Sequence, residues 1–232
     1  MAEKIRYTRK DLKGPDEFIS AFSRAVAWSR ENRAKVLAAA GVVTLMVVGA
    51  LGVQAYFRWE ENKANRELWP HMNRAREVLL SPSTADRDKL AGLEQFLSAH
   101  VNKHPGTAAS VYARYYLAGI AFIGGNYDGS AAQYRAAIDA GKAEGIMPFL
   151  LRTGLAQALE AKGDFAGAVD AYREAAAAGG GELRTQAQLG EARVLHLSGK
   201  KKESAALYRQ ILTSASDPRT RELVEIKLAQ AE

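Results

Sequence analysis

One stretch of the chain carries no charged residue. It is Val36–Phe57, with the sequence VLAAAGVVTLMVVGALGVQAYF. As an α-helix these 22 residues would extend about 33 Å, and the hydrocarbon core of a bilayer is about 30 Å thick. Its valine, leucine and phenylalanine side chains together favour membrane insertion by roughly 3–6 kcal/mol. Lys35 and Arg58 flank the stretch. The sequence therefore predicts one transmembrane helix.

A buried helix of a soluble protein and a cleaved signal peptide are the alternatives to a transmembrane helix. A buried helix of a soluble protein seldom runs so far without a charge. A cleaved signal peptide has an apolar region of about 7–15 residues after a short basic start, whereas 35 residues come first here. The sequence favours an uncleaved membrane anchor.

The net charge of the 232-residue chain is +6, and its pI of about 9.5 would suit a nucleic-acid partner. The distribution of charge indicates otherwise. Residues 1–35 hold nine Lys/Arg and five Asp/Glu, whereas residues 58–232 are nearly balanced. No nucleic-acid partner is expected. Because basic segments stay in the cytoplasm, residues 1–35 are predicted to be cytoplasmic and residues 58–232 to be exported.

The basic tail has a pattern of its own. Gly14-Pro15-Asp16 is a turn and N-cap signal, and apolar residues recur on one helical face from Phe18 to Val26. This predicts a short amphipathic helix that lies on the inner leaflet and helps to anchor the protein. A helix that binds a partner is the alternative.

The exported part contains three repeats of one pattern. Each repeat has a small residue in a first helix, a turn glycine, and a tyrosine nine residues after that glycine. The turn glycines lie 38 and then 36 residues apart. Each repeat predicts a pair of antiparallel helices, such as 147–161 and 165–178, stacked on the next pair. The small residue is expected to let the two helices approach closely, and the tyrosine is expected to fill the hole beside the next helix. The members are Ala118, Gly125 and Tyr134, then Ala156, Gly163 and Tyr172, then Ala192, Gly199 and Tyr208.

Further helices are expected on both sides of the repeats. A degenerate pair covers Asn65–Leu80 and Asp86–Lys103, and Trp69-Pro70 is predicted to interrupt any helix that arrives from the membrane. A closing helix covers Asp217–Glu232, and its apolar residues are Leu223, Ile226 and Leu228. Long loops between the repeats are expected near 141–145 and 179–181.

These patterns resemble the tetratricopeptide repeat. The layout of tail, membrane helix and repeats is similar to the YfgM-like ancillary subunits of the Sec translocon, with the most specific matches in Leu93–Ile138 and Leu223–Leu228. The resemblance implies an all-α fold, a bacterial inner-membrane location and a periplasmic repeat domain at 58–232. It also implies a non-enzymatic scaffold whose partners are Sec subunits and a periplasmic chaperone or client. An assembly factor of a pilus, secretion system or outer-membrane complex is the alternative.

The resemblance also implies a groove along the first helix of each repeat, suited to an extended peptide or a partner helix. Packing of its aromatic members under the preceding helix pair is the alternative. The groove positions are Tyr112, Tyr115 and Phe122, then Thr153, Gln157 and Glu160, then Gln186, Arg193 and His196.

Little in the sequence predicts catalysis. The chain has no cysteine, which excludes disulfides, thiolate metal sites and cysteine nucleophiles. The common hydrolase, phosphate-loop and zinc-protease motifs do not occur. His100 and His104 lie four residues apart, a spacing that can bind a metal, but no third ligand is near in sequence. We therefore expect no enzyme activity, no cofactor and no metal.

Overall fold

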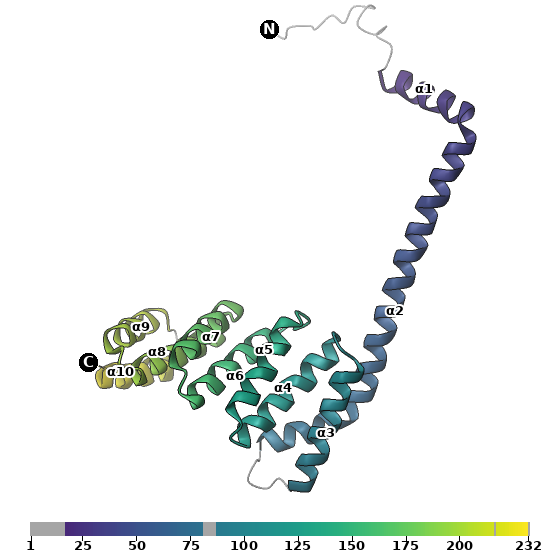
Figure 1. Ribbon diagram of the computed structural model, residues 1–232. Helices are drawn as coiled ribbons and strands as arrows, with labels where there is room; N and C mark the ends of the chain where they lie inside the picture. The colour runs from purple at the N-terminus through teal and green to yellow at the C-terminus, as the bar shows by residue number, and fades with distance from the viewer. Residues whose placement is uncertain (1–16, 81–86, 216, 232) are drawn as a thin grey trace, which may run out of the picture. The chain divides into compact units, whose positions relative to one another are not determined.

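The computed structural model describes residues 17–80, 87–215 and 217–231, and every regular element among them is an α-helix (Figure 1). The all-α prediction is confirmed. The chain divides into two compact units, Met1–Phe57 and Arg58–Glu232.

The first unit contains α1 (Glu17–Glu31) and the beginning of α2 (Arg33–Leu80). The two helices meet at Asn32, whose backbone N–H donates to the carbonyl of Trp28 at 2.9 Å. The helix expected after Asp16 is present as α1, whereas Gly14-Pro15-Asp16 lies outside the described residues.

Helix α2 is long and apolar enough to cross a membrane. Its most apolar 18-residue window has a mean hydropathy of 2.4, and no side chain of that window is buried. Leu37 and Leu45, for example, are 71% and 74% exposed. The described residues therefore leave the apolar surface of this window uncovered.

The predicted interruption at Trp69-Pro70 is wrong, because Pro70 lies inside α2. Proline lacks an N–H and crowds the preceding turn, so packing must hold the helix together here. Ala64 and Leu68 precede Pro70, Met72 and Ala75 follow it, and all four are buried in one cluster with α3 and α4. Tertiary packing on both sides of the proline keeps the helix continuous.

The second unit is a row of helical hairpins in which each helix from α3 to α10 packs against the next (Figure 1). Helices α4 and α6 also touch, as do α6 and α8. The predicted hairpin at 147–161 and 165–178 agrees with α6 and α7 to within one residue. The helices are α3 (Arg87–Lys103), α4 (Ala108–Ile123), α5 (Tyr127–Asp139), α6 (Met147–Lys162), α7 (Phe165–Ala178), α8 (Gly181–Leu197), α9 (Lys201–Ser214) and α10 (Pro218–Ala231).

The turn glycines end the first helix of each hairpin. Gly125, Gly163 and Gly199 have φ angles of 77°, 88° and 81°, a left-handed conformation that costs glycine little. The next residue starts the second helix in two hairpins. Asn126 accepts a hydrogen bond from the N–H of Gly129, and Asp164 does the same for Gly167.

The repeat tyrosines lock adjacent hairpins together. Tyr134, Tyr172 and Tyr208 are 7%, 2% and 3% exposed, which confirms their predicted burial. A Cβ atom on Gly154 would lie 2.3 Å from Cζ of Tyr134, and one on Gly190 would lie 2.4 Å from Cε1 of Tyr172. Each of these two tyrosines thus occupies the space that a glycine leaves in the first helix of the next hairpin.

Small residues bring the two helices of a hairpin close together. Ala118, Ala156 and Ala192 are fully buried, as predicted. In the third repeat Ser204 stands where alanine is usual. Its Oγ donates to the carbonyl of Ala192 at 2.8 Å, so the buried hydroxyl has a partner.

The closing helix buries only part of the set expected. In α10 Val224 and Ala231 are buried and Leu228 is partly buried, whereas Leu223 and Ile226 are 45% and 52% exposed. Helix α10 packs mainly on α9. The long loop expected near 179–181 is also absent, because α8 begins at Gly181, only three residues after α7 ends.

Candidate protein-binding groove

The first helices of the hairpins, α4, α6 and α8, carry the residues predicted to form the groove. They border two separate hollows in the second unit. The polar hollow has a volume of about 260 Å³. It is lined by Thr153, Gln157, Tyr172, Gln186, Leu189, Gly190, Arg193, Tyr208, Leu223 and Lys227.

A three-residue network joins α6, α7 and α8 beside the polar hollow. Arg193 Nη1 lies 2.6 Å from Glu160 Oε1, and its Nη2 donates to the hydroxyl of Tyr172 at 3.1 Å. The same hydroxyl donates to Glu160 Oε2 at 3.5 Å. Burial raises the pKa of Tyr172 to about 12, so the phenol keeps the proton that it donates. Glu160 and Arg193 therefore neutralise each other across neighbouring repeats.

The aromatic hollow is larger, with a volume of about 800 Å³, and lies between α2, α4 and α6. Trp69 is 71% exposed there, and Ile146 is 53% exposed. The hollow is lined by Arg66, Trp69, Pro70, Met72, Asn73, Arg76, Tyr112, Tyr115, Tyr116, Ile146, Met147 and Leu150.

The three aromatic residues predicted for the groove differ in their surroundings. Tyr112 is 38% exposed and lines the aromatic hollow. Tyr115 lines it too, but is half-buried, and its ring centroid lies 6.1 Å from that of Tyr134. Phe122 packs 5.3 Å from Tyr127 at the start of α5. Tyr115 and Phe122 pack on the core shared by α4–α8.

The nine predicted positions thus do not gather at one site. Thr153, Gln157, Gln186 and Arg193 line the polar hollow, and Glu160 pairs with Arg193. His196 lines neither hollow, and its buried Nδ1 has no hydrogen-bond partner among the described residues. Sequence reasoning missed Trp69, which it used only as part of a helix-breaking signal.

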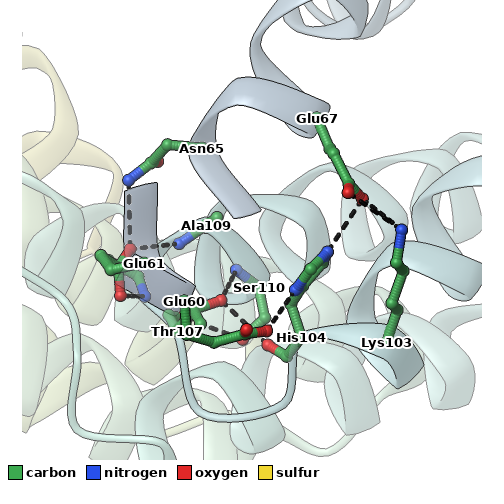
Figure 2. Close-up of polar contacts among 10 residues, drawn as sticks. Glu60, Glu61, Asn65, Glu67, Lys103, His104, Thr107, Ala109 and Ser110 are labelled. Carbon is green, nitrogen blue, oxygen red and sulfur yellow. Dashed lines mark hydrogen bonds and ion pairs between the residues drawn. The ribbon is translucent and has the colours of Figure 1, made fainter. Parts of the chain in front are cut away.

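A polar cluster fastens α2 to the start of α4 (Figure 2). Glu61 accepts hydrogen bonds from the backbone N–H groups of Ala108 and Ala109, at 3.0 and 3.3 Å. The first N–H groups of a helix have no partner within it, so a carboxylate there satisfies them and complements the helix dipole. Asn65 donates to the same carboxylate at 3.2 Å.

His104 is the centre of this cluster and is completely buried. Its Nδ1 lies 2.6 Å from Glu60 Oε1, and its Nε2 lies 2.9 Å from Glu67 Oε2 (Figure 2). Lys103 Nζ also bonds to both oxygens of Glu67. Hydrogen bonds from Lys103, and then from His104, lower the pKa of Glu67 to about 2. We call Glu60, Glu61, Glu67, Lys103 and His104 the α2 clasp.

His100 lies one helical turn before His104 and is 3% exposed. In the part of the chain that the structure describes, its Nε2 has no hydrogen-bond partner. Burial lowers the pKa of His100, which favours the neutral ring. The ring centroids of His100 and His104 are 4.9 Å apart, and His71 stacks on Phe96 beside them at 3.8 Å.

Residues 90–144 and 153–218, just over half of the chain, match the sequence model of the tetratricopeptide repeat. The chain belongs to the tetratricopeptide repeat family. The fold is also that of crystal structures of nearly identical TPR-like repeats from a Podosopora anserina protein described as a kinesin light chain. That structure and a single-residue variant of it are 18% identical to this chain with a TM-score of 0.62. The match covers 72% of this chain and 86% or 85% of theirs.

No curated protein matches the chain. Proteins built from tetratricopeptide repeats are generally non-enzymatic scaffolds for protein partners. This tetratricopeptide protein has a polar hollow beside the Glu160–Arg193 ion pair and a larger hollow with exposed aromatic residues.

Proposed function

We propose that this tetratricopeptide protein is a membrane-tethered scaffold whose aromatic hollow binds a segment of a partner protein. The observation that carries the proposal is the exposure of Trp69, Tyr112 and Ile146 around a hollow of about 800 Å³. Exposed apolar patches rimmed by polar groups mark interaction sites, and aromatic residues supply most hot spots of protein interfaces.

The charges around the hollow select the kind of segment. Arg66 and Arg76 line it together with the aromatic residues. A partner segment with apolar anchors and nearby acidic side chains would complement both features. Binding should therefore weaken as the ionic strength rises.

The tether and the compartment are part of the same proposal. Val36–Phe57 is free of charge, and the tail before it carries the larger share of the net positive charge. The positive-inside rule then places residues 1–35 in the cytoplasm and residues 58–232 in the periplasm. Anchoring would hold the aromatic hollow close to proteins that emerge from the membrane, so that even a low affinity gives binding through a high local concentration.

The proposed partners follow from the resemblance to the YfgM-like ancillary subunits. They are subunits of the Sec translocon and a periplasmic chaperone or client. Assembly proteins of a pilus, secretion system or outer-membrane complex are the competing class, and the identity of a captured partner decides between the two.

The test is site-specific photo-crosslinking in cells, followed by mass spectrometry. A photo-reactive amino acid replaces Tyr112 in the aromatic hollow or, as the control, exposed Lys202 on α9. We expect a discrete adduct from position 112 that is lost when Trp69→Ala is added. Capture at position 202 but not at position 112 would place the binding surface outside the groove.

The polar hollow is tested with a second pair of variants. Glu160→Ala combined with Arg193→Ala removes both charges together, so neither is left unpaired, and folding should persist. If the polar hollow also binds the partner, a photo-crosslinker at Gln157 loses its adduct in this double variant. An unchanged adduct would show that the ion pair serves the fold alone.

A further inference from the structure

Three of the chain's four histidines, His71, His100 and His104, lie together beside the carboxylate of Glu67. One ligand atom each from Glu67, His100 and His104 lies within 4.8 Å of the others. The hydrogen bonds of the α2 clasp explain the burial of His104. They do not explain His100, whose buried Nε2 has no hydrogen-bond partner among the described residues.

We propose that Glu67, His100 and His104 bind a divalent transition-metal ion, with Zn²⁺ as the best match. Two histidines and one glutamate form a known three-ligand set for zinc, and water commonly fills the fourth position. Imidazole and carboxylate ligands suit Zn²⁺, whereas Mg²⁺ and Ca²⁺ prefer oxygen ligands alone.

The ligand atoms of Glu67 and His104 already lie close to the spacing that this ion requires, and the ligand atom of His100 lies within 4.8 Å of both. Two ligand atoms that are each about 2.0 Å from a tetrahedral zinc lie about 3.3 Å apart. His104 Nε2 and Glu67 Oε2 are 2.9 Å apart, and they need to separate only slightly to admit the ion. The ion would also satisfy buried His100.

Glu60 lies where its carboxylate can orient the ring of a metal-bound His104. A metal-bound histidine usually donates its other ring N–H to such a group, which fixes the tautomer and the orientation of the ring. Glu60 Oε1 lies 2.6 Å from His104 Nδ1, which leaves Nε2 for the metal. The fold therefore supplies both the ligands and the group that orients one of them.

Lys103 would have to move to admit the ion. Its Nζ bonds to Glu67 at 2.8 Å, but its side chain is 56% exposed and can turn into solvent. With the ion bound, Glu67 on α2 and two histidines at the end of α3 would share one centre. The ion would thus link α2 to the end of α3.

The experiment uses the full chain in detergent, carrying an affinity tag without histidines and stripped of metal with a chelator. Zn²⁺ is titrated against a chromophoric chelator, and thermal unfolding is followed by circular dichroism. We expect one equivalent of Zn²⁺ per chain and a higher Tm with the ion bound. The absence of binding by the unmodified chain would overturn the proposal.

The variants separate a metal site from a structural cluster. His100→Leu removes a ligand while keeping an apolar buried side chain, so folding without metal should persist. The His100→Leu substitution should weaken Zn²⁺ binding by more than roughly 10–100-fold, which is the cost of losing a group that only orients a metal ligand. Glu60→Gln should cost that 10–100-fold. His196→Leu, a matched control on α8, should change neither affinity nor the zinc-induced shift in Tm. Equal affinity in His100→Leu and the unmodified chain would refute the site.

Discussion

Gly154 and Gly190 are required by what lies opposite them and not by their backbone angles. The ring of Tyr134 fills the space beside Gly154, and the ring of Tyr172 fills the space beside Gly190. By contrast, Gly92 on α3 has no atom within 4 Å of the place where a Cβ would lie. The same substitution should therefore have opposite effects at the two kinds of glycine.

Gly154→Ala should destabilise the repeat domain by about 1–3 kcal/mol, because the new methyl group overpacks the buried junction. Gly92→Ala, the matched control, should stabilise it by about 0.5–1 kcal/mol, because alanine is the better helix former. Urea unfolding followed by circular dichroism measures both. Similar effects from the two variants would contradict the tight fit at Gly154.

Tyr172 is the second test at this scale. Tyr172→Ala should destabilise the domain by about 2–5 kcal/mol, as is typical for truncation of a large buried side chain. Tyr172→Phe removes only the hydroxyl and leaves Glu160 and Arg193 to pair, so it should cost about 0.5–1.5 kcal/mol. If denaturant titration shows a loss below about 0.5 kcal/mol for the alanine variant, the ring does not hold the junction.

Among the elements, the carboxylate of Glu61 links α2 to the first turn of α4. Glu61→Ala removes the acceptor for two N–H groups at the start of α4, and it should cost about 1–3 kcal/mol. Glu77→Ala, an exposed glutamate further along α2, is the matched control and should change stability by less than about 0.5 kcal/mol. Hydrogen exchange at Ala108 and Ala109 should rise in the first variant alone. Unchanged hydrogen exchange at Ala108 and Ala109 would mean that another group accepts hydrogen bonds from their N–H groups.

The hairpins were predictable from the sequence because their signals are local. A glycine in a left-handed turn and a tyrosine nine residues later lie on one short segment, so their spacing fixes the helix bounds. The face buried by α10 was not predictable. Leu223, Val224, Ile226 and Leu228 lie all around a short helix, and only contact with α9 selects Val224.

The candidate sites were less predictable, because their residues come from distant parts of the chain. Glu67 precedes His104 by 37 residues. No local sequence pattern links a glutamate on α2 to a histidine that follows α3. Pro70 shows that a local pattern can also predict a feature that the fold does not have. A local rule predicted a helix break there, but the buried residues around it keep α2 intact.

At the scale of the whole molecule, the proposed membrane anchor is Val36–Phe57. Leu45→Arg would place a charge near the middle of the stretch and cost about 3–4 kcal/mol of insertion free energy. The fraction of protein that resists carbonate extraction should fall. Leu197→Arg, at an exposed leucine in the repeat domain, is the control and should leave retention unchanged. Full retention of the Leu45→Arg protein would show that this stretch is not the anchor.

Orientation is a separate prediction. With residues 1–35 in the cytoplasm, a reporter active only in the periplasm should be active when it is fused after Glu232. A reporter active only in the cytoplasm should be silent at the same position. The reverse pattern would invert the proposed topology.

The junctions between hairpins are also interchangeable, because Tyr134 meets Gly154 in the same way that Tyr172 meets Gly190. Deleting α6 and α7 as one block would bring Tyr134 to Gly190 and preserve a complementary joint. Deleting a single helix would leave a tyrosine against an unsuitable surface. In evolution such a chain can therefore gain or lose whole hairpins without inventing a new interface, and each step lengthens or shortens its inner surface by one first helix.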